Sequence, residues 1–333
     1  MDRHKMRAAP VNLMVYVVKK IALFCCSMLL LSIVVFAISR LAPGDPLVSY
    51  YGDRVEKMKP RQRQQAQERL GLQKPVAVQY VLWLERAVHG DFGISYKYKM
   101  DALQVISQRA GATFLLGGTG FALIFGLALL LGMCCAWKED SLADRVLCKA
   151  GTVLSCIPEF WLALVLILLF AVNLKWLPSS GAYTVGREDD LLDRIRHLIL
   201  PLAVAVLEHL WYYAYMIRNM LLEEARADYM LFAKSKGLTK RQVMFRHCLR
   251  GIIPSYLSIM AVSVPHILGG TYIIETVFSY PGLGTLSYES ARYQDYNLLM
   301  LLSLLSGGLV ILCSIAAQII NEKIDPRIKL RKG

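Results

Sequence analysis

Three long apolar stretches without a charged residue constrain the fold of this chain more than any other feature. They cover residues 21–39, 110–137 and 298–320, and none contains Asp, Glu, Lys or Arg. An α-helix needs about 20 consecutive apolar residues to cross the hydrocarbon core of a bilayer. Because backbone amide and carbonyl groups must pair with one another inside lipid, stretches of this length predict membrane-spanning helices.

Three further apolar stretches contain ionisable side chains, which are costly inside a membrane and usually face a cavity or a partner. They are residues 150–174 with Glu159, residues 198–217 with Glu208 and His209, and residues 251–274 with His266. Hydrophobic residues make up 56% of the 333-residue chain, whereas about half is typical of soluble domains. We therefore expect an all-α integral membrane protein with six transmembrane helices.

Basic side chains cluster at the two ends of the chain and predict its orientation. Residues 1–20 and 321–333 are rich in lysine and arginine, and short segments of this kind stay on the cytoplasmic side of a membrane. Six spans also place both termini on one side, so we expect both to be cytoplasmic. No small-residue cleavage site precedes Arg40, so we interpret residues 21–39 as a retained helix and not as a secretory signal.

The segment between the first two spans, residues 40–109, is predicted to lie outside the cell as a loop with short amphipathic helices. It is basic, but it exceeds the length of about 60 residues over which the charge rule holds. Residues 61–70 and 76–88 have helical patterns. The 3.6-residue period predicts an apolar stripe on the second helix, formed by Ala77, Val81, Leu84 and Val88. Residues 110–320 then form a core of five transmembrane helices.

Composition excludes several classes of function. The formal net charge of +13 could indicate nucleic-acid binding, but the charges collect at helix ends that face the anionic inner leaflet, so we expect lipid as the partner and no nucleic acid. The eight cysteines show no CxxC or Cys/His ligand spacing, and we assign no metal ligands. The pattern GxxxxGK[ST] is absent, so any energy from ATP must come from a partner.

Residues 218–250, between the fourth and fifth spans, are helical in pattern but too polar to remain in the membrane. Gly237 interrupts the pattern, so we expect a helix, a turn and a second helix on the cytoplasmic face. Such a helix transmits a partner's motion when apolar anchors rimmed by charges seat it in a groove, although a helix lying on the membrane surface is an alternative. The predicted anchors are Tyr229, Leu231 and Phe232, and the predicted rim is Arg226, Lys234 and Lys236.

This segment resembles the coupling loop of ABC-transporter permeases. The family pattern is EAA followed after three residues by Gly; here Leu231, Phe232 and Ala233 occupy the EAA positions before Gly237, and only Ala233 matches. The dipeptide, oligopeptide and nickel permease subfamily is similar to this chain at further phrases. These are RLAPGDP at 40–46, GDFGISY at 90–96, IPEFWL at 157–162, LPSSGAY at 177–183, ETVFS at 275–279 and DPR at 325–327.

The resemblance implies a permease with the type I ABC importer fold and a cytoplasmic coupling helix, in a bacterial cytoplasmic membrane. It implies a second permease subunit in a heterodimer, two ATPase subunits that bind ATP and magnesium, and an external solute-binding protein. The chain itself would bind no cofactor, catalyse no reaction and form a path for a peptide, a nickel ion or a metal chelate. The residues implied to couple it to the ATPases are Asp228, Tyr229, Phe232, Ala233, Lys234, Lys236 and Gly237.

The ionisable residues Glu208, His209 and His266 are candidates for the transport pathway. Together they could attract a cationic or metal-bearing solute, and they favour a metal slightly over a peptide. Alternatively, they form hydrogen bonds between helices, or act as ion relays in a secondary transporter, although two similar halves are not visible. An intramembrane enzyme is disfavoured because HExxH and GxSxG are absent. We assign Glu275, within ETVFS, to helix packing at the outer gate.

Overall fold

The computed structural model describes residues 13–41, 46–69, 71–154 and 156–324, and this part of the chain is nearly all helical. Five helices in it are long and apolar enough to cross a membrane, which agrees with the predicted all-α membrane class. These helices are α1 (Leu13–Leu41), α5 (Ala102–Trp137), α8 (Leu191–Ala225), α11 (Leu249–Val277) and α13 (Tyr296–Ile324).

The predicted third span, residues 150–174, is divided in the structure. Its first residues belong to helix α6 (Leu142–Leu154), and a new helix, α7 (Glu159–Leu166), starts after Pro158 and continues as a π-helical segment, Ile167–Asn173. Pro158 is extended, with φ −62° and ψ 137°, and a proline ring favours a helix start over a helix interior. The apolar helix after it is roughly 20 Å long at 1.5 Å per residue, which is shorter than the other spans.

Two of the spanning helices begin at aspartate caps. The Asp101 carboxylate accepts a hydrogen bond from the Leu103 amide at 2.8 Å, where α5 begins. Asp190 caps α8 in the same way, through the amides of Leu192 and Asp193. Such caps satisfy amide groups that have no partner within the helix, and each stabilises its helix by about 1 kcal/mol.

Helices α5 and α8 pack closely along their length and form the centre of the core. Phe125 and Ala128 of α5 lie in one buried cluster with Ala214 and Ile217 of α8. A Cβ atom on Gly132 would lie 2.9 Å from Ile217 Cγ2 and 3.0 Å from the Ala214 carbonyl oxygen. Glycine at this position therefore allows the two helices to approach, as small residues do where helices associate in lipid.

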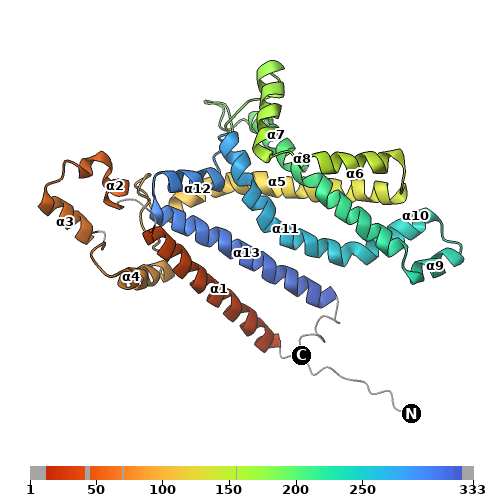
Figure 1. Ribbon diagram of the computed structural model, residues 1–333, viewed down its shortest axis with the longest axis horizontal. Coiled ribbons are helices and arrows are strands. Elements are labelled where there is room, and N and C mark those ends of the chain that lie inside the picture. Colours follow the sequence, from red (N-terminus) through yellow and green to blue (C-terminus); the bar gives the residue numbers. More distant parts are fainter. Residues whose placement is uncertain (1–12, 42–45, 70, 155, 325–333) are drawn as a thin grey trace, which may run out of the picture.

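Helices α1 and α13 lie side by side along another edge of the bundle (Figure 1). The Lys20 ammonium donates to the Gln318 side chain at 2.7 Å, and the Tyr16 hydroxyl donates to Glu322 at 2.6 Å. The first turns of α1 and the last turns of α13 are therefore adjacent. Both helices point toward the end of the molecule that carries helices α9 (Asp228–Ser235) and α10 (Lys240–Gln242) (Figure 1).

The segment between α1 and α5 contains short helices at the opposite end of the molecule (Figure 1). They are α2 (Pro46–Tyr51), a 3-10 turn (Gly52–Val55), α3 (Pro60–Arg69) and α4 (Val76–Val88). The predicted helices at 61–70 and 76–88 agree with α3 and α4, except that residue 70 lies outside the described residues. The short helices predicted for this region are therefore present.

Of the apolar stripe predicted on α4, Leu84 packs against the bundle, but the prediction was wrong for the valines. Trp83 is the buried residue of this helix and packs in one cluster with Phe36 of α1 and Met300 of α13, whereas Val81 and Val88 are 60% and 77% exposed. Tyr80 contributes a further edge-to-face contact, with its ring centroid 5.3 Å from that of Phe36. Aromatic rings bury more area than valine and so decide which face of the helix packs.

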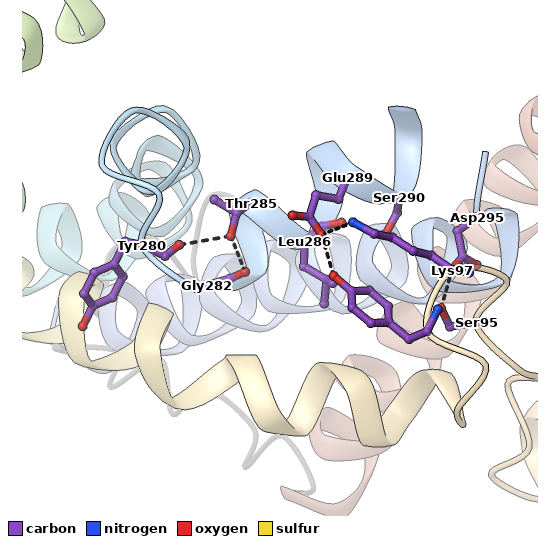
Figure 2. A network of polar contacts seen from close by, with 10 residues as sticks. Ser95, Lys97, Tyr280, Gly282, Thr285, Leu286, Glu289, Ser290 and Asp295 are labelled. Carbon is purple, nitrogen blue, oxygen red and sulfur yellow. Dashed lines mark hydrogen bonds and ion pairs between the residues drawn. The ribbon is translucent and has the colours of Figure 1, made fainter. Parts of the chain in front are cut away.

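A polar network ties the loop before α5 to helix α12 (Leu283–Arg292) and to the start of α13 (Figure 2). The Asp295 carboxylate accepts hydrogen bonds from the Ser95 hydroxyl and the Lys97 amide. Glu289 accepts from the Lys97 ammonium at 2.7 Å and from the Tyr98 hydroxyl at 2.5 Å. Burial and the bond to Glu289 raise the pKa of Tyr98 to about 12, so this hydroxyl remains a donor at neutral pH.

Candidate coupling helix and transport cavity

The polar segment after α8 folds as the predicted helix, turn and helix. Helix α9 is followed by Gly237, whose φ is +81°, and the chain then passes through α10 and a π-helical segment, Val243–Cys248, into α11. A Cβ atom on Gly237 would meet nothing within 4 Å. Glycine is therefore favoured here for its left-handed backbone conformation and not for space.

Helix α9 is anchored to the bundle by one methionine and presents aromatic side chains outward. Met230 is 0% exposed and belongs to the buried cluster of α5 and α8, whereas Tyr229 is 53% exposed and Phe232 is 61% exposed. The Lys236 ammonium lies 4.4 Å from the centroid of the Phe232 ring. Met230 was missed from the sequence, because the three residues after Asp228 are all apolar and the pattern alone does not show which of them faces the bundle.

The remaining predicted coupling residues are placed on the same helix. Asp228 is exposed and lies in the first turn of α9, where a negative charge complements the helix dipole. Ala233 and Lys234 lie in the backbone of α9, but their side chains are outside the described residues, as is that of Leu231. We therefore define the outward surface of α9 and the residue after it by three described side chains: Tyr229, Phe232 and Lys236.

A buried ion pair braces the last turns of α8, from which α9 projects. The Arg218 guanidinium donates to both oxygens of Asp144 on α6, at 2.5 and 2.6 Å, and Asp144 is only 2% exposed. The Asp140 amide adds a third hydrogen bond to the same carboxylate. The hydrogen bonds from Arg218 lower the pKa of Asp144 despite its burial. Paired bonds of this kind fix orientation as well as distance.

The three predicted pathway residues line one cavity. Glu208 and His209 of α8 and His266 of α11 surround a volume of about 570 Å³, and the ring centroids of the two histidines are 5.4 Å apart. The rest of the wall comes from the same two helices and includes Tyr212, Tyr213, Met216, Ser258, Val262 and Ser263. The volume lies within the range of about 300 to 1,000 Å³ that is usual for small-molecule sites.

Glu159 joins this group from helix α7, which sequence reasoning did not anticipate. Its side chain is 8% exposed and lies close enough to Glu208 for the two carboxyl groups to interact. Oε1 of Glu159 and Oε2 of Glu208 are buried and have no hydrogen-bond partner in the described part of the chain. The presence of acidic residues in two separate apolar stretches was the signal that could have suggested the pair.

Residues 128–330 match the family described as binding-protein-dependent transport system inner membrane component, and residues 13–116 match the N-terminal domain of such membrane components. The chain belongs to this permease family. The chain is thus the permease subunit of an ABC importer, as predicted, and is not a secondary transporter.

Individual relatives support the same assignment. The oligopeptide transport system permease protein AppB of Bacillus subtilis is 32% identical, over 94% of this chain and 99% of its own length. A protein of Sinorhizobium fredii named "Probable peptide ABC transporter permease protein y4tP" is 30% identical, over 95% of this chain and 99% of its own. Each relative is matched over nearly its whole length.

A solved structure of the MetNI methionine ABC transporter, in inward-facing conformations, is similar in fold. The likeness covers 67% of this chain and 97% of the other, with 16% identity and a TM-score of 0.52. The chain therefore has an ABC importer permease fold and is a non-catalytic, multi-pass subunit of the inner membrane. Its partners in the importer are an ATPase and a solute-binding protein.

In this permease, Glu275 holds three helices together at the end opposite α9. The side chain is 0% exposed and accepts hydrogen bonds from Thr113 of α5 at 2.7 Å and from the amides of Gly284 and Thr285 at the start of α12. A Cβ atom on Gly282 would overlap its carboxyl group. Because all of these contacts lie within the chain, the structure agrees with the packing role expected for Glu275.

Proposed function

We propose that this permease forms one half of the pathway of a peptide importer, paired with a second permease as a heterodimer. Two ATPase subunits, which bind ATP and magnesium, drive it, and a solute-binding protein delivers the peptide from outside. The names of AppB and y4tP support a peptide and not the metal that the polar pathway residues slightly favoured. We also propose that both termini and α9 lie in the cytoplasm.

The observation that carries this proposal is the outward surface of α9. Tyr229 and Phe232 are large and exposed, and they lie on α9, which Met230 anchors to the bundle. Helix α8, from which α9 projects, is held to α6 by the bond between Arg218 and Asp144. Exposed aromatic side chains on a rigid helix seat in a partner's groove and move with it. We assign Asp228, Tyr229, Phe232, Ala233, Lys234, Lys236 and Gly237 to the contact with the ATPase.

The pathway residues complete the proposal. We assign Glu208, His209 and His266 to the wall of the transport path, because they surround one cavity between α8 and α11. When ATP binding closes the ATPase pair, α9 moves with it and the helices exchange an inward-facing for an outward-facing arrangement. The cavity is then open to each side of the membrane in turn.

Photo-crosslinking tests the role of α9. A photoreactive phenylalanine analogue at position 232 is expected to form an adduct with the ATPase subunit in inner-membrane vesicles of the full importer. The same analogue at position 288 is the matched control, since Tyr288 is also aromatic and is 42% exposed, but lies on α12 near the opposite end (Figure 1). An adduct from position 288 but none from position 232 would contradict the proposal.

A further inference from the structure

We infer that a basic patch at the tip of the segment between α1 and α5 binds an acidic surface of the solute-binding protein and steers its approach. The inference rests on the proposed function and topology, which place this segment outside the cell, and adds to them the surface that receives the partner. The outer basic patch is defined by four exposed side chains at the start of α3 and in the turns before it: Arg54, Lys57, Lys59 and Arg61.

The patch concentrates positive charge that the chain itself does not neutralise. Residues 54–63 contain five lysines and arginines but a single acidic residue, Glu56. Arg63, the fifth cation, already has an interaction partner and is left out of the patch. In the part of the chain that the structure describes, none of the four patch side chains forms a hydrogen bond or an ion pair. Their field is therefore open to a partner outside the chain.

The position of the patch on α3 makes this charge less favourable in the isolated chain. The N-terminus of an α-helix carries a partial positive charge, so acidic side chains are favoured in the first turn and cations in the last. Helix α3 has no acidic residue in its first turn, whereas Lys59 directly precedes the helix and Arg61 lies in that turn. Local electrostatics does not explain why these cations lie there, but an acidic partner would offset their repulsion.

A protein fits this patch better than the membrane surface does. In Figure 1, α2 and α3 extend beyond the end of α1, whereas α4 lies beside α1, where Trp83 packs with Phe36. Since α1 crosses the membrane, the tip projects away from the lipid headgroups. The anionic inner leaflet, which accounts for the basic ends of the chain, lies on the opposite side under the proposed topology.

The tip that carries the patch is a small folded unit fixed to the bundle. Leu47, Val55 and Ala66 form its own buried apolar cluster. The ring of Tyr50 packs edge-to-face against that of Tyr96, with centroids 5.5 Å apart, and Tyr96 is buried. A partner bound at the patch is thus held at a fixed position relative to the loop before α5 and, through the network of Figure 2, relative to α12 and α13.

The association rate of the solute-binding protein tests the inference. The full importer, with second permease and ATPases, is reconstituted in nanodiscs, and binding of its solute-binding protein is followed by stopped flow. Lys57→Glu combined with Arg61→Glu is expected to lower the association rate constant about tenfold at low salt, because charged patches steer the encounter of two proteins. The difference should nearly vanish at about 1 M salt, where the Debye length falls to about 3 Å.

Matched variants separate charge from folding. Lys74→Glu reverses an exposed lysine between α3 and α4, outside the patch, and should lower the rate much less. Lys57→Gln combined with Arg61→Gln removes two charges without reversing them and should give an intermediate rate. Because a glutamate in the first turn favours a helix, the double Glu variant should keep α3 folded, and limited proteolysis of the tip should match the wild type.

The outcomes distinguish the inference from the proposed function. A photoreactive phenylalanine analogue at position 57 should form an adduct with the solute-binding protein, and adducts with lipid alone would overturn the inference in favour of a membrane contact. If the wild type takes up peptide with ATP but the double Glu variant associates at the same rate, the inference is overturned and the proposed function stands. If the patch sets the association rate but no peptide is taken up, the inference stands and the proposed substrate class is wrong.

Discussion

A single backbone angle, at Gly237, separates α9 from α10. At this position φ is +81° and the surrounding space is open. An L-residue with a side chain adopts such an angle at a cost of roughly 1 to 2 kcal/mol, whereas proline holds φ near −65° and cannot adopt it. The direction in which the chain leaves α9 toward α10 therefore depends on one glycine.

Gly237→Pro is expected to abolish peptide uptake and the coupling of ATPase activity to substrate, because the turn after α9 can no longer form. Membrane insertion should be unaffected. The measurements are uptake and ATPase activity in reconstituted vesicles, with insertion checked by membrane fractionation. Gly237→Ala, which costs only about 1 kcal/mol, should reduce uptake only partly.

Gly186→Pro is the matched control for Gly237→Pro. Gly186 has φ +86° and open space around it, but it lies in the loop between α7 and α8, away from α9. The same change of conformation there should leave uptake largely intact. Normal uptake by Gly237→Pro would show that the turn is not part of the coupling device.

At the scale of elements, α6 and α8 act as a support for α9. Arg218 and Asp144 join the two helices through two hydrogen bonds, and Asp144 is buried. Removing one partner of a buried ion pair leaves an uncompensated charge and costs about 3 kcal/mol. Helix α6 thus stabilises the end of α8 even though α6 is not one of the five long spans.

Asp144→Asn is expected to lower the midpoint of thermal denaturation of the purified importer at pH 7. Because the folded pKa of Asp144 is lowered, its contribution is complete above the ordinary aspartate value of about 3.9 and is lost as pH falls through the lowered pKa. The difference between variant and wild type should therefore shrink in acid. Thermal denaturation of both proteins in detergent, repeated from pH 7 down to the lowest pH at which the wild type stays folded, measures this difference in midpoint.

Glu139→Gln is the control for the buried pair. Glu139 forms an ion pair with Arg226 at 2.5 Å, but Arg226 is 70% exposed in its side chain. Exposed ion pairs contribute about 0 to 1 kcal/mol, so this variant should denature close to the wild type. Equal destabilisation by the two variants would contradict the buried brace.

At the scale of the whole molecule, the two ends of the structure carry different sets of short helices. Helices α2 to α4 lie at one end, and α9 and α10 lie at the other, with the first turns of α1 and the last turns of α13 directed toward α9 (Figure 1). The contacts of Lys20 and Tyr16 with α13 keep those turns adjacent. This arrangement favours placing both termini on the same side of the membrane as α9.

Labelling of single cysteines tests this orientation in a variant that lacks the native cysteines. Val185→Cys, at a position that is 92% exposed in the loop before α8, is expected to react with a membrane-impermeant maleimide in intact spheroplasts. Tyr229→Cys on α9 is expected to react only after permeabilisation. In open membranes of cells that lack the ATPase subunits, where α9 is uncovered, the two variants should label to similar extents, which is the control for reactivity. Labelling of Tyr229→Cys in intact spheroplasts would reverse the topology.

Long-range contacts were the part of the fold and the site that could not be predicted. Met230 and Tyr229 are neighbours in one apolar run, yet Met230 is buried and Tyr229 is exposed. Asp144 and Arg218 are 74 positions apart, and Glu159 meets Glu208 across two helices. Neither the burial of Met230 nor the two long-range contacts follow from local periodicity, because each depends on how separate helices rotate and pack.

The sequence by itself determined the membrane class, the long spans, the helical break at Gly237 and the presence of three ionisable residues in the pathway spans. These are local properties: hydropathy measures the cost of placing a segment in lipid, and glycine supplies a backbone angle that other residues avoid. Only the tertiary structure decided which side of α9 faces outward, that α7 starts after Pro158, and that Glu159 lies beside Glu208. Those features arise when distant helices exclude lipid and water from one another, and that happens only in the packed bundle.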